Sequence, residues 1–192
     1  MARHQVVKMS PPALDISALK ILVVDDNKFM RLTVVSILRS FHCYDVRTAT
    51  DGADAFKIMQ NYLPDIIITG WRMLPLDGIE FTRILRAKTG EPEEMIPVIM
   101  MSAYSEDIYV KQARDAGVNE FLVKPLSATN LYLRLVEVII HPRPFVRSKN
   151  FKGPCRHRHN DYARNYPWDA RRSDDKLFDA GVPQDHDDQT KD

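Results

Sequence analysis

Runs of consecutive apolar residues alternate along the chain with segments in which apolar residues recur every three or four positions. A continuous apolar run is typical of a strand that is buried on both faces, as in a parallel sheet. Five runs fit this description, although the second is weaker than the others. The predicted strands lie at residues 21–24, 44–48, 65–69, 96–101 and 121–123.

The segments that follow these strands carry the periodicity of amphipathic helices. The periodic apolar positions are Met30, Val34, Leu38 and Phe41; Ala55, Ile58, Met59 and Tyr62; Ile79, Ile84 and Leu85; and Leu131, Leu135, Val138 and Ile139. A further helix is predicted from a cap at Ser105 to a terminating glycine at Gly117. Strands that alternate with helices predict a doubly wound α/β fold, with helices on both faces of a five-stranded parallel sheet.

Polar residues gather at the points where the predicted strands end. In open parallel sheets the ligand site lies beyond the carboxyl ends of the strands. The residues at that edge are Asp25, Asp26, Gly70, Ser102 and Lys124. Adjacent carboxylates suit Mg²⁺, while a lysine and a hydroxyl could each contact a phosphoryl oxygen. This set is suited to phosphoryl transfer, which depends on positioning and charge neutralisation.

One component of such a site is missing. A covalent phosphoryl acceptor here would be a carboxylate, but Gly70 has no side chain. Asp65 lies at the other end of the same strand and Asp77 lies past the next loop, so neither replaces it easily.

Four motifs, taken in order and spacing, resemble the receiver domain of bacterial two-component response regulators, specifically the single-domain chemotaxis type. They are Ile21–Asp26, Met73–Gly78, Met101–Ala103 and Val123–Pro125. The resemblance covers residues 19–141 and implies a flavodoxin-like receiver fold. It also implies a signalling protein of a phosphorelay and not an enzyme.

The resemblance assigns a role to each residue of the edge. It implies that Asp25, Asp26 and the backbone carbonyl of Arg72 bind Mg²⁺, and that Ser102 and Phe121 are the switch residues. Lys124 would contact phosphate and would be joined to Pro125 by a cis bond. Gly70 would occupy the phosphoacceptor position. We therefore expect a non-phosphorylatable or locked receiver with weakened Mg²⁺ binding. Two origins remain open: an altered position in a working receiver, or a natural pseudo-receiver that signals by binding alone.

The resemblance also implies partners. A histidine kinase or histidine phosphotransferase would act upstream, and a protein target would bind the face formed by the fourth helix, fifth strand and fifth helix. That face is expected to include Tyr109, Lys111, Phe121 and Tyr132. The chain has two cysteines and lacks both a signal peptide and a membrane-spanning apolar run, so we expect a cytoplasmic location and no membrane partner.

The ends of the chain differ in composition from the predicted domain. Residues 1–18 are expected to form a flexible lead, and residues 142–192 a disordered tail that is first basic and then acidic. The arginine-rich part suggests an alternative function, in which the tail of an anion-binding protein holds nucleic acid or a nucleotide. A steep loss of binding with salt would distinguish that alternative from docking through an apolar face.

Overall fold

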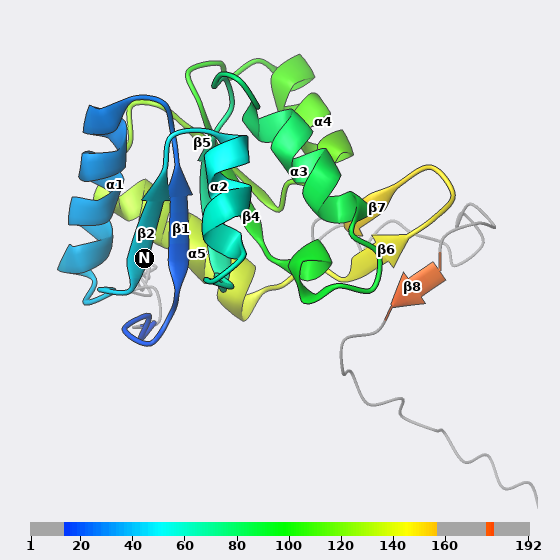
Figure 1. The fold of residues 1–192 in the computed structure, drawn as a ribbon, viewed down its shortest axis with the longest axis horizontal. Helices are drawn as coiled ribbons and strands as arrows, with labels where there is room; N and C mark the ends of the chain where they lie inside the picture. The colour runs from blue at the N-terminus through cyan, green and yellow to red at the C-terminus, as the bar shows by residue number, and fades with distance from the viewer. Residues whose placement is uncertain (1–13, 157–175, 179–192) are drawn as a thin grey trace, which may run out of the picture.

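The computed structural model describes residues 14–156 and 176–178 (Figure 1). From β1 to α5 the strands alternate with α-helices, a short 3₁₀ helix, η1, precedes the fourth strand, and three short strands follow α5. In chain order they are β1 Ile21–Val24, α1 Lys28–Ser40, β2 Val46–Ala49, α2 Gly52–Met59, β3 Ile66–Gly70, α3 Gly78–Ala87, η1 Pro92–Met95, β4 Val98–Ser102, α4 Asp107–Ala116, β5 Glu120–Val123, α5 Ala128–Ile140, β6 Phe145–Arg147, β7 Lys152–Pro154 and β8 Lys176–Phe178.

The first five strands form one parallel sheet in the order β2-β1-β3-β4-β5. The doubly wound α/β prediction is therefore confirmed. The chain moves outward from β1 to β2 and then returns to β3 on the other side of β1. Doubly wound proteins place their ligands at such a reversal, which here lies beyond the carboxyl ends of β1 and β3.

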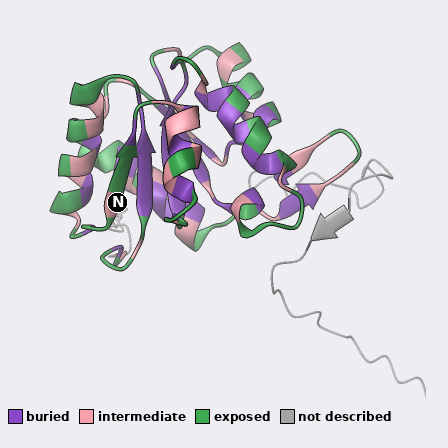
Figure 2. Ribbon diagram, in the orientation of Figure 1, coloured by how far each residue is buried: buried purple, intermediate pink, exposed green. Residues whose placement is uncertain are grey.

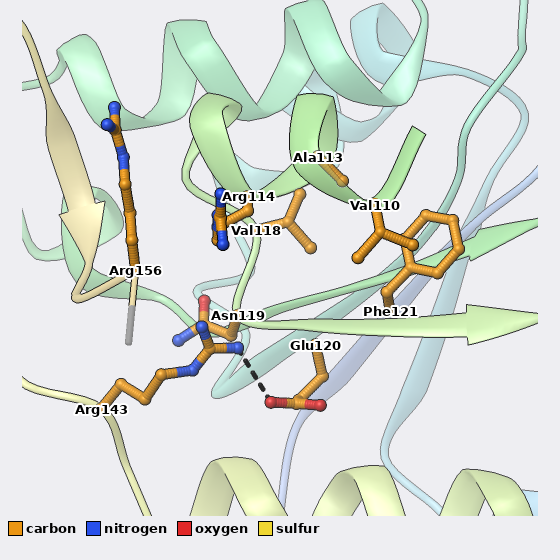
Figure 3. A pocket seen from close by; sticks show the side chains of 9 residues that line it. All are labelled: Val110, Ala113, Arg114, Val118, Asn119, Glu120, Phe121, Arg143 and Arg156. Carbon is orange, nitrogen blue, oxygen red and sulfur yellow. Dashed lines mark hydrogen bonds and ion pairs between the residues drawn. The ribbon is translucent and has the colours of Figure 1, made fainter. Parts of the chain in front are cut away.

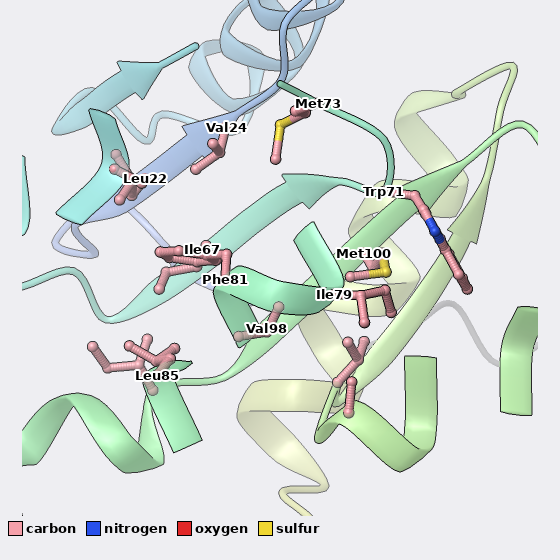
Figure 4. Close-up of a cluster of buried hydrophobic side chains, with 14 of the residues drawn as sticks. Leu22, Val24, Ile67, Trp71, Met73, Ile79, Phe81, Leu85, Val98 and Met100 are labelled. Atoms are coloured by element: carbon pink, nitrogen blue, oxygen red, sulfur yellow. The ribbon is translucent and has the colours of Figure 1, made fainter. Parts of the chain in front are cut away.

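Alternate residues of each strand face opposite sides of the sheet and form two cores. In β1, Leu22 and Val24 pack with residues of α2, α3 and α4, as Figure 4 shows for Leu22, Val24, Phe81 and Leu85. Ile21 and Val23 instead pack with residues of α1 and α5. The three inner strands β1, β3 and β4 are buried throughout because both faces are covered (Figure 2), which explains their continuous apolar runs. The edge strand β2 is partly exposed, in agreement with its weaker apolar run.

Side-chain caps start four of the five α-helices. Asn27, Asp51, Asp77 and Ser127 each accept hydrogen bonds from backbone N–H groups of the first turn. The prediction of Ser105 as a cap is wrong: α4 begins one residue later, after Glu106, which makes no side-chain capping bond. The prediction of a terminating glycine is confirmed, because Gly117 adopts φ +95° at the end of α4.

The first residues of the predicted tail are ordered, so the expectation of disorder does not hold for residues 142–156. Strands β6 and β7 form an antiparallel hairpin, and β8 pairs with the other edge of β6. Phe145 and Val146 are buried, and Gly153 lies so close to Gly117 that a Cβ on Gly153 would stand 2.8 Å from the Gly117 Cα. Residues 157–175 and 179–192 lie outside the described residues.

Part of the predicted N-terminal lead is also packed. The side chain of Ile16 is fully buried in the α1–α5 core, and the backbone N–H of Leu14 donates to the Tyr132 hydroxyl at 2.9 Å. Residues 1–13 lie outside the described residues. In the described part of the chain, the helices are too short or too polar to cross a bilayer.

Two buried glutamates receive the arginines of the hairpin segment. Glu94 is fully buried and accepts from Arg147 at 2.6 and 3.1 Å. Glu120, 5% exposed, accepts from Arg143 at 2.9 Å and from Arg134 at 3.0 Å. These ion pairs hold in place a segment that has little apolar surface of its own. A buried carboxylate is stable only when it is paired, so both glutamates favour the position of the segment that brings an arginine to them.

The buried side chain of Arg86 connects η1 to the end of α4 through hydrogen bonds. Its guanidinium donates to the carbonyl oxygens of Gly117, Glu94 and Ile96 and to the Asn119 side chain. Burial lowers the pKa of Arg86 to about 9, although the Glu94 charge raises it. The guanidinium therefore remains charged at neutral pH.

We predict that Arg86→Met destabilises the protein by about 3–5 kcal/mol, because it leaves several buried acceptors without a donor. Urea denaturation measures this loss. Arg83→Met removes an exposed arginine from the same helix and should change the free energy of unfolding by no more than about 0.5 kcal/mol. Equal effects of the two substitutions would contradict the role assigned to Arg86.

The Glu94 pair predicts a loss of stability in acid. Burial raises the pKa of Glu94, but the hydrogen bonds from Arg147 and the Gly90 N–H outweigh it and leave the pKa below its usual 4.5. A carboxyl whose pKa is lowered by folding stabilises the protein above the unfolded pKa and loses that contribution as the pH falls through the folded pKa. The stability difference between the protein and Glu94→Gln should therefore shrink below about pH 4.5. The exposed Glu91→Gln serves as the control, and a difference that is constant with pH would refute the assignment.

Candidate functional site

Asp25 stands at the carboxyl end of β1 and is 1% exposed. Its Oδ1 atom accepts from the backbone N–H of Asn27 at 3.0 Å, and its Oδ2 atom accepts from Lys124 Nζ at 2.8 Å. Asn27 is also the cap of α1, so the turn that starts this helix holds the carboxylate in place. The ion pair joins the end of β1 to the residue after β5, two elements at different positions in the sheet.

Asp26 is exposed beside this pair. The guanidinium of Arg31 in α1 donates to the backbone carbonyl of Asp25 at 2.6 Å and to that of Asp26 at 3.2 Å. Arg31 thus supports the backbone of both acidic residues. Arg31 was not among the predicted site residues, although its closeness to the Asp-Asp pair in the sequence was a usable signal.

Gly70 ends β3 directly beside Asp25. A Cβ at position 70 would stand 2.8 Å from Asp25 Oδ2, 3.3 Å from Asp25 Cγ and 3.6 Å from the Met73 sulfur. The Asp25 carboxylate, held by Lys124, therefore occupies the space next to the position where a residue-70 side chain would begin. The backbone of Gly70 has no positive φ, so only this side-chain contact opposes a larger residue.

Ser102 and Lys124 lie at the ends of the neighbouring strands β4 and β5. The backbone N–H of Lys124 donates to the Ser102 carbonyl at 2.7 Å. Ser102 is 2% exposed, and its hydroxyl accepts from the backbone N–H of Tyr104 at 3.0 Å. The Lys124–Pro125 bond is cis, as the resemblance implies.

An aromatic cluster extends from Gly70 toward α4. Trp71 meets the Phe121 ring at 6.0 Å and the Tyr109 ring at 5.5 Å, both edge to face. Tyr104 packs on Tyr109 at 4.8 Å, and the Arg72 guanidinium lies 4.9 Å from the Tyr104 ring centre. Phe121 is thereby in contact with the residue that follows Gly70. Phe121 could be predicted from its motif but its ring partners could not, since ring contacts between distant segments leave no local pattern in the sequence.

The structure thus brings Asp25, Gly70 and Lys124 into direct proximity, with Asp26 beside them. The two other aspartates considered have structural roles. Asp65 accepts from the backbone N–H of Lys20 at the opposite end of the sheet, and Asp77 caps α3. In the described part of the chain, no three His, Cys, Asp or Glu side chains form a cluster that could hold a metal ion.

The predicted partner face is only partly open. Lys111 is exposed, whereas Tyr109 and Phe121 are half-buried against Trp71. The Tyr132 ring lies 5.4 Å from Phe41 at the end of α1, and its hydroxyl accepts from Leu14.

Comparison with known proteins agrees with this geometry. Residues 21–136 match the model of the response regulator receiver domain. The chemotaxis proteins CheY-3 of Vibrio cholerae and CheY of Pseudomonas aeruginosa are each 32% identical over 120 residues, which span 62% of this chain and 91% and 95% of those proteins.

Solved structures lead to the same assignment. The chemotaxis protein CheY4 of Vibrio cholerae has a TM-score of 0.58 at 28% identity, covering 63% of this chain and 98% of that one. The CheX–CheY complex of Borrelia burgdorferi with BeF₃ and Mg²⁺ has a TM-score of 0.56 at 28% identity, covering 62% of this chain and 88% of the matched one. The chain therefore belongs to the response regulator receiver domain family of two-component signalling.

Proposed function

We propose that this receiver works by protein–protein interaction and does not form an aspartyl phosphate at position 70. The observation that carries the proposal is the contact between Gly70 and Asp25. Position 70 has no nucleophile, and the adjacent space holds a carboxylate that is already paired with Lys124. A receiver in this arrangement would keep one signalling state whatever its phosphodonor supply.

Asp25, Asp26 and the Arg72 carbonyl are the groups that would hold Mg²⁺. Carboxylate and carbonyl oxygens are the ligands that Mg²⁺ prefers, so the donor chemistry fits. The related Borrelia burgdorferi CheY was solved in a complex with Mg²⁺. Two features weaken Mg²⁺ binding in this chain. Position 70 supplies no carboxylate, unlike a receiver with an aspartate there, and Asp25 Oδ2 already accepts from Lys124. A bound metal would supply positive charge next to Asp25.

The partners we propose are those of a receiver. A histidine kinase or a histidine phosphotransferase would approach the Gly70 edge of the sheet. A protein target would bind the face of α4, β5 and α5, where Ile108 is 63% exposed and Lys111 is exposed. The aromatic contact between Trp71 and Phe121 links the two surfaces.

Intact-mass analysis after incubation with Mg²⁺ and acetyl phosphate tests the missing acceptor. We expect no phosphoryl adduct on the protein, because position 70 has no nucleophile. Gly70→Asp should acquire one adduct once the Asp25 carboxylate turns away, and Gly70→Asn, of the same size without the charge, should acquire none. An adduct on the unsubstituted protein would overturn the proposal, and its absence from Gly70→Asp would show that more than the acceptor has been lost.

Mg²⁺ affinity tests the charge argument. Gly70→Asp should bind Mg²⁺ at least several-fold more tightly than the protein, since affinity rises with the number of anionic ligands. Quenching of Trp71 fluorescence measures it, in a Trp168→Phe background that leaves Trp71 as the only tryptophan. Gly70→Asn separates the charge from the size of the new side chain. If Gly70→Asp and Gly70→Asn bound Mg²⁺ equally, our account of the site would fail.

A further inference from the structure

The β6–β7 hairpin lies against the end of α4, and the two backbones are in close contact. A Cβ on Gly153 would stand 2.8 Å from the Gly117 Cα, and a Cβ on Gly117 would stand 3.0 Å from the Lys152 carbonyl oxygen. Gly153 also has φ +153°, which disfavours a larger residue. Alanine at position 153 would therefore push the hairpin away from the end of the helix.

Two arginines attach the hairpin segment on both sides of this contact. Arg156 Nε lies 3.4 Å from Asp115 Oδ1 in the last turn of α4. Arg143 donates at 2.9 Å to Glu120 at the start of β5, as Figure 3 shows. The first pair is largely exposed and contributes little, whereas the buried Glu120 requires its cations. The hairpin is thus fastened at both ends of the connection between α4 and β5.

The hairpin is also attached to the segment before β4. Arg147 donates to Glu94 in η1 at 2.6 and 3.1 Å, and Lys152 Nζ donates to the Thr89 hydroxyl. Because Glu94 is fully buried, its ion pair gives the hairpin a fixed position relative to the sheet. The hairpin can therefore hold the end of α4 in place.

A hollow lies beside α4, between this helix, β5 and the segment after α5. Its volume is about 260 Å³, and Val110, Ala113 and Arg114 line it from the helix (Figure 3). Close packing normally keeps a helix in one position. Where a hollow adjoins the helix, the contacts at the helix end contribute more to its position.

The first turn of α4 reaches the Gly70 edge of the sheet. Tyr109 meets the Trp71 ring edge to face at 5.5 Å and packs on Tyr104 at 4.8 Å. Trp71 directly follows Gly70 in the chain. A packed helix shifts as a unit, so a displacement of α4 at the hairpin would also change the surroundings of Trp71.

We propose that the β6–β7 hairpin is a clamp on α4, and that its release changes the partner face of this receiver. The proposal rests on the proposed function, in which α4, β5 and α5 bind the protein target without phosphorylation at position 70. The position of α4 would then be controlled from the amino ends of β4 and β5, where the hairpin lies, and not from the Gly70 edge.

Hydrogen–deuterium exchange of the full chain tests the clamp. In Gly153→Ala, the amides in the second half of α4 should exchange roughly tenfold faster relative to those of α1, because the helix end is released. Gly90→Ala is the matched control. Gly90 also has positive φ, +87°, but no atom of the described residues lies within 4 Å of a Cβ there, so the ratio should stay unchanged.

The reactivity of Cys155 reports the release of the hairpin directly. Cys155 is buried behind β7, and Cys43→Ala removes the other cysteine of the chain. Gly153→Ala should speed the labelling of Cys155 by a maleimide, and so should Arg147→Met, which removes the ion pair with Glu94. If neither substitution speeds the labelling, these contacts do not hold the hairpin and the proposal fails.

Trp71 distinguishes a clamp from a hairpin that stabilises its own surroundings alone. In the Trp168→Phe background, acrylamide should quench Trp71 more strongly in Gly153→Ala but not in Gly90→Ala. If Cys155 becomes more reactive while either the exchange of α4 or the quenching of Trp71 stays unchanged, the proposal is refuted. Because these measurements use no phosphodonor, their failure would leave the result of the intact-mass experiment on position 70 unaffected.

Discussion

The ion pair between Asp25 and Lys124 organises the carboxyl edge of the sheet. A buried carboxylate is unfavourable without a partner, and Asp25 satisfies both oxygens at once through Asn27 and Lys124. Lys124 is still 24% exposed on its side chain, so the pair is not fully removed from water. Because this pair joins the end of β1 to the residue after β5, it connects these two strand ends without a side chain at position 70.

The same constraint, that a buried carboxylate requires a cation, explains the ordered part of the tail. Glu94 lies in the 3₁₀ helix before β4 and Glu120 at the start of β5, both buried. Each receives an arginine from beyond α5, Arg147 and Arg143 respectively. The hairpin is thus held at the opposite end of β4 and β5 from Ser102 and Lys124. Charge complementarity fixes a segment that apolar burial alone would not.

Much of the architecture could be predicted, because buried strands and amphipathic helices have distinct periods. The five strands, the helices between them and the terminating role of Gly117 follow from local patterns. The prediction that Ser105 caps α4 failed because this helix starts without a side-chain cap. The expectation of disorder failed for residues 142–156 for another reason: their low apolar content predicts disorder, but the buried Glu94 and Glu120 bind arginines of this segment.

The sequence by itself determined the α/β order, the set of chemical groups at the strand ends and the absence of a carboxylate at position 70. These are local properties, carried by residue type and short-range periodicity. Only the tertiary structure decided what fills the space beside Gly70, which rings touch Trp71, and which arginines pair with the buried Glu94 and Glu120. Those contacts join segments tens of residues apart, and their energy depends on distance and burial, which sequence spacing does not encode.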